Sequence, residues 1–309
     1  MRTSPLSVAE ADTQQKARRG LAIYLVAVVL ITGTFDVLIL TINPLWIFGR
    51  MFSPAVASVL ARLVLREGFA DVSFRLGGRR TWKTMALALI LPIVIGTIAY
   101  GLAWTTGLAQ FDPQPSAGLG AQLASEVTSS PMAMFVIMLV LATIVWVFPQ
   151  SVFAAGEEIG WRGYMLTRLI DAGVPRPVLV SVVIWGLWHM DLIFGFGYMA
   201  GPSVLLSAVL FMVWAGALGF VLARMRLETG SVWPAIVLHG AWNSITQTAF
   251  DPVSTGGVGT ALWVGESGIL VVVVSVVVAT IYSRGRWTIR RVPEEPGEVE
   301  PAASPMPQT

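Results

Sequence analysis

The feature that most constrains the fold is a series of long apolar runs, which together occupy most of the 309 residues. Most of the runs approach the ~20 residues that an α-helix needs to cross the hydrocarbon core of a bilayer. A backbone amide cannot stay unpaired in hydrocarbon, so such a chain crosses the membrane as helices or as a closed barrel. The short alternating segments of barrel strands are absent. The sequence therefore predicts an all-α integral membrane protein.

The composition supports this class and excludes others. Charged residues make up only 12% of the chain, whereas soluble domains carry about 25%. Cysteine is absent, which rules out disulfides, thiolate metal sites and a cysteine nucleophile. The pI of about 9.2 is better explained by basic residues that flank membrane spans than by nucleic acid. We expect the lipid bilayer as a partner and no nucleic acid.

About eight transmembrane helices are expected. The first run starts at Leu21, is too long for the apolar core of a signal peptide and has no small-residue cleavage site, so it is expected to be retained. Residues 1–20 form an expected cytoplasmic segment, 21–283 the membrane domain, and 284–309 a disordered cytoplasmic tail rich in proline and glutamate. The expected spans are 21–42, 47–65, 84–108, 131–156, 177–197, 203–223, 232–250 and 267–283.

The distribution of basic residues predicts the orientation. If both termini are cytoplasmic, every one of the 20 Lys and Arg residues except Arg50 falls on the cytoplasmic side of this eight-span arrangement. That asymmetry is the one the positive-inside rule requires. We therefore expect a multi-pass protein of the plasma membrane.

Ionisable side chains inside the expected spans mark the candidate site. Each costs ~2.5 to 3.5 kcal/mol on insertion scales, so each is a functional hypothesis. Both histidines of the protein, His189 and His239, lie in such spans, and Glu157 and Glu158 stand at the inner end of the fourth. Asp36 and Asp191 also lie in spans; they fit no motif, and their roles are left open.

Helical spacing separates the two glutamates. Glu158 and Arg162 are four residues apart in the favourable acid-before-base order, so they are expected to pair. Glu157 points about 100° away and is free to face the helix bundle, which makes it the better candidate for a general base.

The histidines have companions one turn away. His239 shares a helix face with Asn243, and His189 shares one with Trp185. The candidates meet only if their helices tilt or kink, for which Pro149, Gly156 and Gly186 offer places, and the resulting cavity is expected to open towards the cytoplasm.

A carboxylate beside two imidazoles supports two mechanisms. Glu157 can deprotonate a water that attacks a carbonyl carbon, while an imidazole and an amide stabilise the oxyanion. Alternatively, Glu157, His189 and His239 form a set that can bind Zn²⁺ with a position left for water. The residues alone leave both open.

The order of these residues resembles a known family. The motifs Glu157-Glu158-x-x-x-Arg162, Trp185-x-x-x-His189 and His239-x-x-x-Asn243, on successive expected helices within about 130–250, are similar to those of the CPBP family. That family comprises CAAX proteases and bacteriocin-processing enzymes, is also called Abi, and includes the type II CAAX prenyl endopeptidases. The second motif departs from the family pattern, which usually has phenylalanine where this chain has Trp185.

The resemblance implies an intramembrane endopeptidase. By that likeness Glu157 and His189 activate water, His239 and Asn243 form the oxyanion hole, and Glu158 and Arg162 orient the site. Members have also been described as metal-dependent, so the metal stays open. The implied substrate is a prenylated CAAX-like peptide or another membrane-associated peptide, which enters from the membrane or the cytoplasm.

Two other functions compete with this one. Glutamates and histidines in membrane helices also relay protons or bind ions in transporters and channels, which typically have repeated halves; no repeat is evident in this sequence. The third candidate is a catalytically idle immunity or interaction protein with the same fold. Taken singly, Glu158 with Arg162 reads as an interfacial ion pair and Asn243 as a helix-packing residue.

Overall fold

The computed structural model describes residues 8–198, 201–257 and 259–284. Helices make up most of this part of the chain, and two short strands pair antiparallel with Gln110 opposite Thr255. The helices and strands are α1 (Val8–Thr41), α2 (Ile47–Arg50), α3 (Ser53–Leu65), α4 (Arg79–Thr106), β1 (Gln110–Phe111), α5 (Leu119–Ser125), α6 (Pro131–Leu141), α7 (Val147–Gly160), α8 (Leu166–Asp171), α9 (Pro177–Leu187), α10 (Met190–Phe196), α11 (Val204–Thr229), α12 (Trp233–Ile245), β2 (Ser254–Thr255) and α13 (Ile269–Ser283).

Several of these helices are long and apolar enough to cross a membrane. Within the described residues there are five such stretches, or six if the bent pair Pro44–Arg50 and Ser53–Leu65 counts as one span. The helix Ile269–Ser283 is apolar but shorter. The prediction of an all-α, multi-pass membrane protein is confirmed in this coarser form. The count of eight crossings and the cytoplasmic location of both termini stay predictions.

The helix ends differ most from the expected spans in two places. α1 begins at Val8 rather than at Leu21, so its first part is polar. The fourth span was expected to end at residue 156, but the helical stretch continues to Asp171 through wide π-turns at Ala142–Trp146 and Trp161–Met165. The charges that suggested an end at 156 are buried and paired within the helix, as described below. Most of the expected tail lies outside the described residues.

One expected span is a bent pair of helices, and another has a short turn within it. α2 and α3 meet at an angle of 41°. The span expected over 177–197 consists of α9, which ends at Leu187, and α10, which begins at Met190. His189 lies at this break, as the residue that precedes α10. The turn is slight, because Trp188 and His189 keep helical backbone angles and Pro177–Phe196 still forms one apolar stretch.

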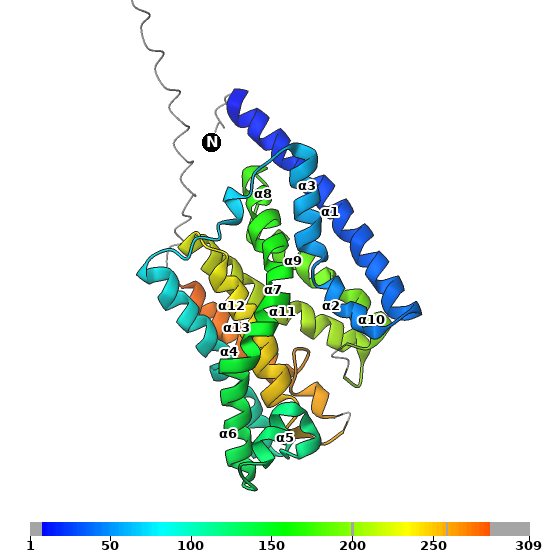
Figure 1. The fold of residues 1–309 in the computed structure, drawn as a ribbon, viewed down its shortest axis with the longest axis vertical. Helices are drawn as coiled ribbons and strands as arrows, with labels where there is room; N and C mark the ends of the chain where they lie inside the picture. Colours follow the sequence, from blue (N-terminus) through cyan, green and yellow to red (C-terminus); the bar gives the residue numbers. More distant parts are fainter. Residues whose placement is uncertain (1–7, 199–200, 258, 285–309) are drawn as a thin grey trace, which may run out of the picture.

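α12 lies inside the bundle and packs against α7 and α4, as Figure 1 shows. A glycine permits the close approach to α7, because a Cβ atom on Gly240 would lie 2.7 Å from the backbone nitrogen of Ser151. Small residues at such crossings let helix backbones approach closely in membranes. Gly240 directly follows His239 and thereby brings this histidine beside the glutamates of α7.

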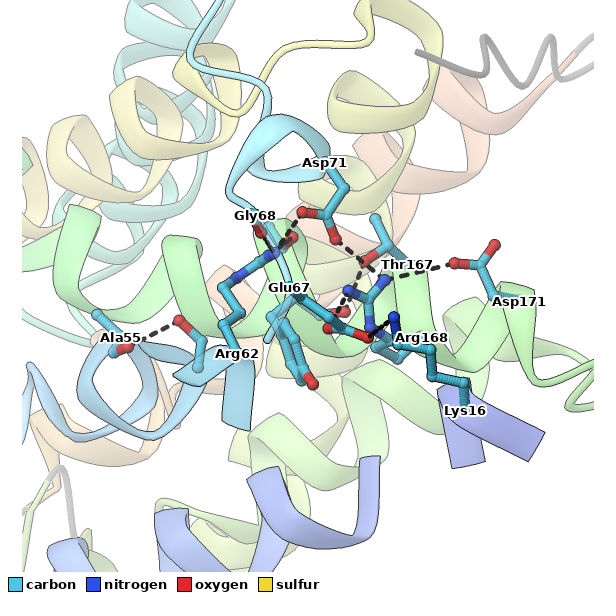
Figure 2. A network of polar contacts seen from close by, with 12 residues as sticks. Lys16, Ala55, Arg62, Glu67, Gly68, Asp71, Thr167, Arg168 and Asp171 are labelled. Carbon is cyan, nitrogen blue, oxygen red and sulfur yellow. Dashed lines mark hydrogen bonds and ion pairs between the residues drawn. The ribbon is translucent and has the colours of Figure 1, made fainter. Parts of the chain in front are cut away.

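A second polar cluster, here called the loop clamp, consists of Lys16, Arg62, Glu67, Asp71 and Arg168 (Figure 2). It ties α1, α3 and α8 to the loop that follows α3, with Arg168 Nη2 2.7 Å from Glu67 Oε2 and Arg168 Nη1 3.0 Å from Asp71 Oδ2. Arg62 Nη1 lies 2.5 Å from Asp71 Oδ1, and Lys16 Nζ lies 3.7 Å from Glu67 Oε1. The clamp has no residue in the cavity described next.

Candidate active site

A cavity of about 430 Å³ contains the predicted catalytic residues. Its wall includes Glu157 of α7, His189 at the break between α9 and α10, and His239 and Asn243 of α12. The four side chains are mostly buried, and Glu157 is only 2% exposed. The structure thus brings together the residues that the three motifs singled out, from three separate segments of the chain.

Glu158 and Arg162 form the predicted pair. Arg162 Nη1 lies 2.8 Å from Glu158 Oε1, and both side chains are fully buried. The same carboxylate oxygen lies 2.9 Å from Nδ1 of His239, a contact that spacing along α7 could not predict. Neither member of the pair lines the cavity. The pair is therefore a buried support behind the site rather than an interfacial ion pair.

Glu157 faces the cavity and is held by Trp185. The indole Nε1 donates a hydrogen bond to Glu157 Oε2 at 2.9 Å. This donor exists only because the second motif carries tryptophan, since phenylalanine has no N–H. The departure from the family pattern therefore supplies a contact to the candidate base.

The indole of Trp185 also organises the neighbouring groups. Its ring lies edge-to-face with His189 and with His239, at centroid distances of 5.5 and 5.7 Å. The Arg162 guanidinium carbon lies 4.5 Å from its ring centroid. The helix spacing predicted that Trp185 and His189 share a face, but these further contacts arise only from helix packing.

Hydrogen bonds define the tautomers of the two histidines. Nδ1 of His189 lies 2.9 Å from the carbonyl oxygen of Trp185, which can only accept, so this nitrogen carries the hydrogen. Nδ1 of His239 faces the Glu158 carboxylate in the same way. In a neutral ring with this tautomer, Nε2 keeps its lone pair and is available to a water.

The fit of a metal ion can be tested from the positions of these donors. A free Nε2 with a hydrogen-bonded Nδ1 is the usual arrangement of a metal-ligating histidine. However, no three His, Asp or Glu side chains in the described part of the chain are grouped so that they could hold a metal ion. Glu157, His189 and His239 do not fit a three-ligand site in this conformation, and the chemistry below uses the side chains alone.

Arg50, Asp36 and Asp191 form a further cluster at the cavity. Arg50 is 1% exposed; its Nε lies 2.8 Å from Asp36 Oδ1, and its Nη2 lies 2.8 Å from Asp191 Oδ1. The guanidinium carbon also lies 4.0 Å from the ring centroid of Trp188. In the sequence, Arg50 was the one arginine outside the positive-inside pattern, and Asp36 and Asp191 were aspartates that fitted no motif. Their pairing was missed because no local spacing connects them.

Glu266 also lines the cavity, although the sequence did not indicate it as a site residue. It stands in the loop before α13 and lines the same cavity as Glu157. Trp242 Nε1 and the Tyr198 hydroxyl each donate to it at 3.0 Å. Burial raises the pKa of Glu266, against the lowering effect of these hydrogen bonds. The only signal in the sequence was a lone carboxylate directly before an apolar run.

A second cavity of about 500 Å³ lies beside the first and shares Gln247 with it. Asp251 lines this second cavity and accepts a hydrogen bond from the Tyr100 hydroxyl. Burial raises the pKa of the Asp251 carboxyl to about 7, while the Tyr100 hydrogen bond lowers it. Asp251 has no part in the cluster around Glu157.

Comparison with known proteins supports the motif assignment. Residues 129–245, which include all three motifs, match the family model described as type II CAAX prenyl endopeptidase Rce1-like. No curated protein matches the chain. Over the segment that supplies Glu157, His189, His239 and Asn243, the chain is therefore similar to the type II CAAX prenyl endopeptidases, and the resemblance expected from its motifs is confirmed.

Proposed function

We propose that the protein is an intramembrane endopeptidase in which Glu157 activates water. The observation that carries this proposal is the division between the two adjacent glutamates. Glu158 binds Arg162 and His239 and does not line the cavity. Glu157 lines the cavity together with both histidines. A partly desolvated carboxylate beside imidazoles is suited to general base catalysis.

The side chains provide each step of peptide hydrolysis. Glu157, assisted by Nε2 of His189, takes a proton from water, and the water oxygen bonds to the carbonyl carbon of the scissile peptide. The carbonyl π electrons move to its oxygen, which Asn243 and His239 stabilise by hydrogen bonds. His239 donates from Nε2 when both of its ring nitrogens carry hydrogen, and the adjacent Glu158 carboxylate stabilises that cationic ring. The C–N bond then breaks, and Glu157 returns the proton to the leaving amine.

The cavity wall suggests an amphipathic substrate. Besides the polar cluster it contains the apolar side chains of Ile39, Ile47, Phe48, Leu192 and Phe196. Phe48 and Phe196 are exposed at the surface of the helix bundle, where lipid would surround them. This lining suits a peptide with an attached apolar chain, so a prenylated CAAX-like peptide is the first substrate to test.

The test is cleavage by purified protein in lipid nanodiscs, followed by mass spectrometry. Wild type is expected to cut a prenylated peptide or members of a proteome-derived peptide mixture, and Glu157→Gln should lose about 10² to 10⁴-fold in rate. Glu126→Gln is the matched control, because Glu126 is exposed and does not line the cavity. Cleavage by a folded Glu157→Gln variant at the wild-type rate would contradict the mechanism and favour the idle-protein alternative.

Metal dependence can be measured in the same assay. A strong chelator is expected to leave the cleavage rate unchanged, since the described His, Asp and Glu side chains form no group of three that could hold a metal. Loss of activity with the chelator, restored by added Zn²⁺, would show that Glu157, His189 and His239 regroup around a metal during turnover.

The side on which the cavity opens is a separate question. The lining residues Ile39 and Pro44 lie at and just after the C-terminal end of α1. If the N-terminus is cytoplasmic, this favours a mouth on the opposite side rather than the expected cytoplasmic opening. The absence of cysteine permits a direct test with Leu45→Cys near this mouth and Arg75→Cys in the loop after α3.

Both positions are exposed, so a membrane-impermeant thiol reagent can reach them. On intact cells we expect Leu45→Cys to react and Arg75→Cys to react only after permeabilisation. The reverse pattern would mean that the mouth faces the cytoplasm and that the predicted orientation of the N-terminus is wrong.

A further inference from the structure

Glu266 lies in the candidate active site but outside the residues that match the family model. It belongs to the loop before α13, whereas the match ends at residue 245. Its carboxylate is only 3% exposed and lines the cavity together with Glu157. The steps of hydrolysis proposed above do not use it.

The hydrogen-bond donors to Glu266 are all neutral. Trp242 Nε1 and Gln247 Nε2 donate to Oε1 at 3.0 and 3.4 Å, and the Tyr198 hydroxyl donates to Oε2 at 3.0 Å. In the described part of the chain no lysine, arginine or histidine lies within 4.0 Å of this carboxylate. An ionised carboxylate has about four acceptor positions, so these three donors leave it with capacity for a further ligand.

The rest of the cavity supplies no cation in direct contact with Glu266, since His239 acts on it only at longer range and is bound through Nδ1 to Glu158. Arg50 is the arginine in its wall, and that guanidinium is already bound by Asp36 and Asp191. Glu157 adds a second carboxylate to the same cavity. A buried carboxylate without a cation is costly unless a partner arrives, so the cavity is complementary to a positively charged group.

The position of Glu266 relates this charge to the scissile bond. Its donor Trp242 directly precedes Asn243 on α12, and Asn243 is the proposed oxyanion donor. Glu266 and Asn243 line the same cavity, so a group bound at Glu266 shares that cavity with the peptide under attack.

We propose that Glu266 binds a lysine or arginine side chain of the peptide substrate and thereby determines which peptides are cleaved. This inference rests on the proposed endopeptidase function. It predicts a substrate with both an apolar group, for the wall around Phe48 and Phe196, and a basic residue near the cleavage site. The bond to the cation uses the free acceptor capacity of the carboxylate, while Tyr198, Trp242 and Gln247 hold it in place.

The test uses peptides that differ at one residue near the scissile bond, with lysine replaced by its uncharged analogue norleucine. For wild type, kcat/KM is expected to be about 10 to 100-fold higher for the lysine peptide, as for hydrogen bonds to charged groups. In Glu266→Gln this ratio should fall close to one. Asp251→Asn is the matched control, an acid-to-amide change in the same loop that faces the other cavity, and should keep the wild-type ratio.

Binding of the same peptides separates this inference from the proposed function. Glu157→Gln in nanodiscs should bind the lysine peptide more tightly than the norleucine peptide, measured by tryptophan fluorescence, and adding Glu266→Gln should abolish the difference. If no peptide is cleaved but this preference is seen, the endopeptidase proposal fails and the cationic subsite stands. If Glu266→Gln lowers the affinity for both peptides equally, or leaves the preference for the lysine peptide intact, the inference is overturned. Glu266 then only links Tyr198 to α12.

Discussion

The structure contains two polar clusters built from the same residue types and used in different ways. In the loop clamp, Glu67 and Asp71 each have two cationic partners. None of the five clamp residues lines the cavity of the candidate active site. In the site cluster, Glu158 is paired in the same manner. Glu157 beside it has an indole N–H as its partner and lines the cavity.

The difference shows how to distinguish, in a membrane protein, carboxylates that hold helices together from carboxylates that can bind a proton or a ligand. A carboxylate that is saturated by cations has little capacity left for a substrate, and it mainly fixes the relative positions of helices. A buried carboxylate with a neutral donor and access to a cavity keeps lone pairs for a proton or a ligand. By this criterion Glu157 and Glu266 are the reactive carboxylates of the cavity, and Glu67 and Asp71 are structural. Glu158 is also structural, because its Oε1 binds Arg162 and His239 and its buried Oε2, which has no hydrogen-bond partner, does not line the cavity.

The largest expected effect comes from Glu158→Gln, which tests whether the paired glutamate of the site cluster is structural. The change leaves the fully buried guanidinium of Arg162 without its counter-charge, which costs about 3 to 5 kcal/mol in the free energy of unfolding. It also weakens the contact that orients His239, so peptide cleavage should be lost. Thermal unfolding in detergent and the cleavage assay measure the two effects.

The double variant Glu158→Gln/Arg162→Met separates these effects. Removing the unpaired charge should restore much of the stability, whereas cleavage should stay low because His239 still lacks its carboxylate partner. Recovery of both would mean that Glu158 serves only as the partner of Arg162.

The sequence predicted the features that depend on local spacing. The pair Glu158 and Arg162 follows from the four-residue interval along one helix, and the structure confirms it. The rotation of Glu157 by about 100° from that pair, towards the helix bundle, follows from the same helical geometry. The motif order indicated which other helices supply His189, His239 and Asn243, and the structure places all of them at one cavity.

The contacts between distant segments could not be predicted from the sequence. Spacing along α7 says nothing of whether Glu158 reaches His239, which depends on the close approach of α12 that Gly240 permits. Arg50 was expected only as the one basic residue on the outer side, yet it is buried between Asp36 and Asp191. The helix of the fourth expected span continues past residue 156 to Asp171, and spacing alone did not show that Glu158 and Arg162 would be a buried pair within it.

A smaller effect is expected from Arg168→Met in the loop clamp, the counterpart of the Glu158 variant. Glu67 keeps Lys16 and Asp71 keeps Arg62 after this change, so the unfolding free energy should fall by only about 1 to 3 kcal/mol. The cleavage rate per folded molecule should equal that of wild type. A fall in that rate would show that the clamp and the cavity are coupled, and the distinction between the two clusters would fail.

The smallest effect is expected from Trp185→Phe, which introduces the residue usual in the family. The ring still packs between His189 and His239, but the hydrogen bond to Glu157 Oε2 is lost. A hydrogen bond to a charged group contributes about 1.5 to 3 kcal/mol, part of which a water can replace, so kcat should fall about ten-fold with KM little changed. Trp185→Leu removes the ring as well and should cost more than Trp185→Phe. Equal kcat in wild type and Trp185→Phe would mean that packing alone positions Glu157, and a larger effect on KM than on kcat would mean that Trp185 contacts the substrate instead of the base.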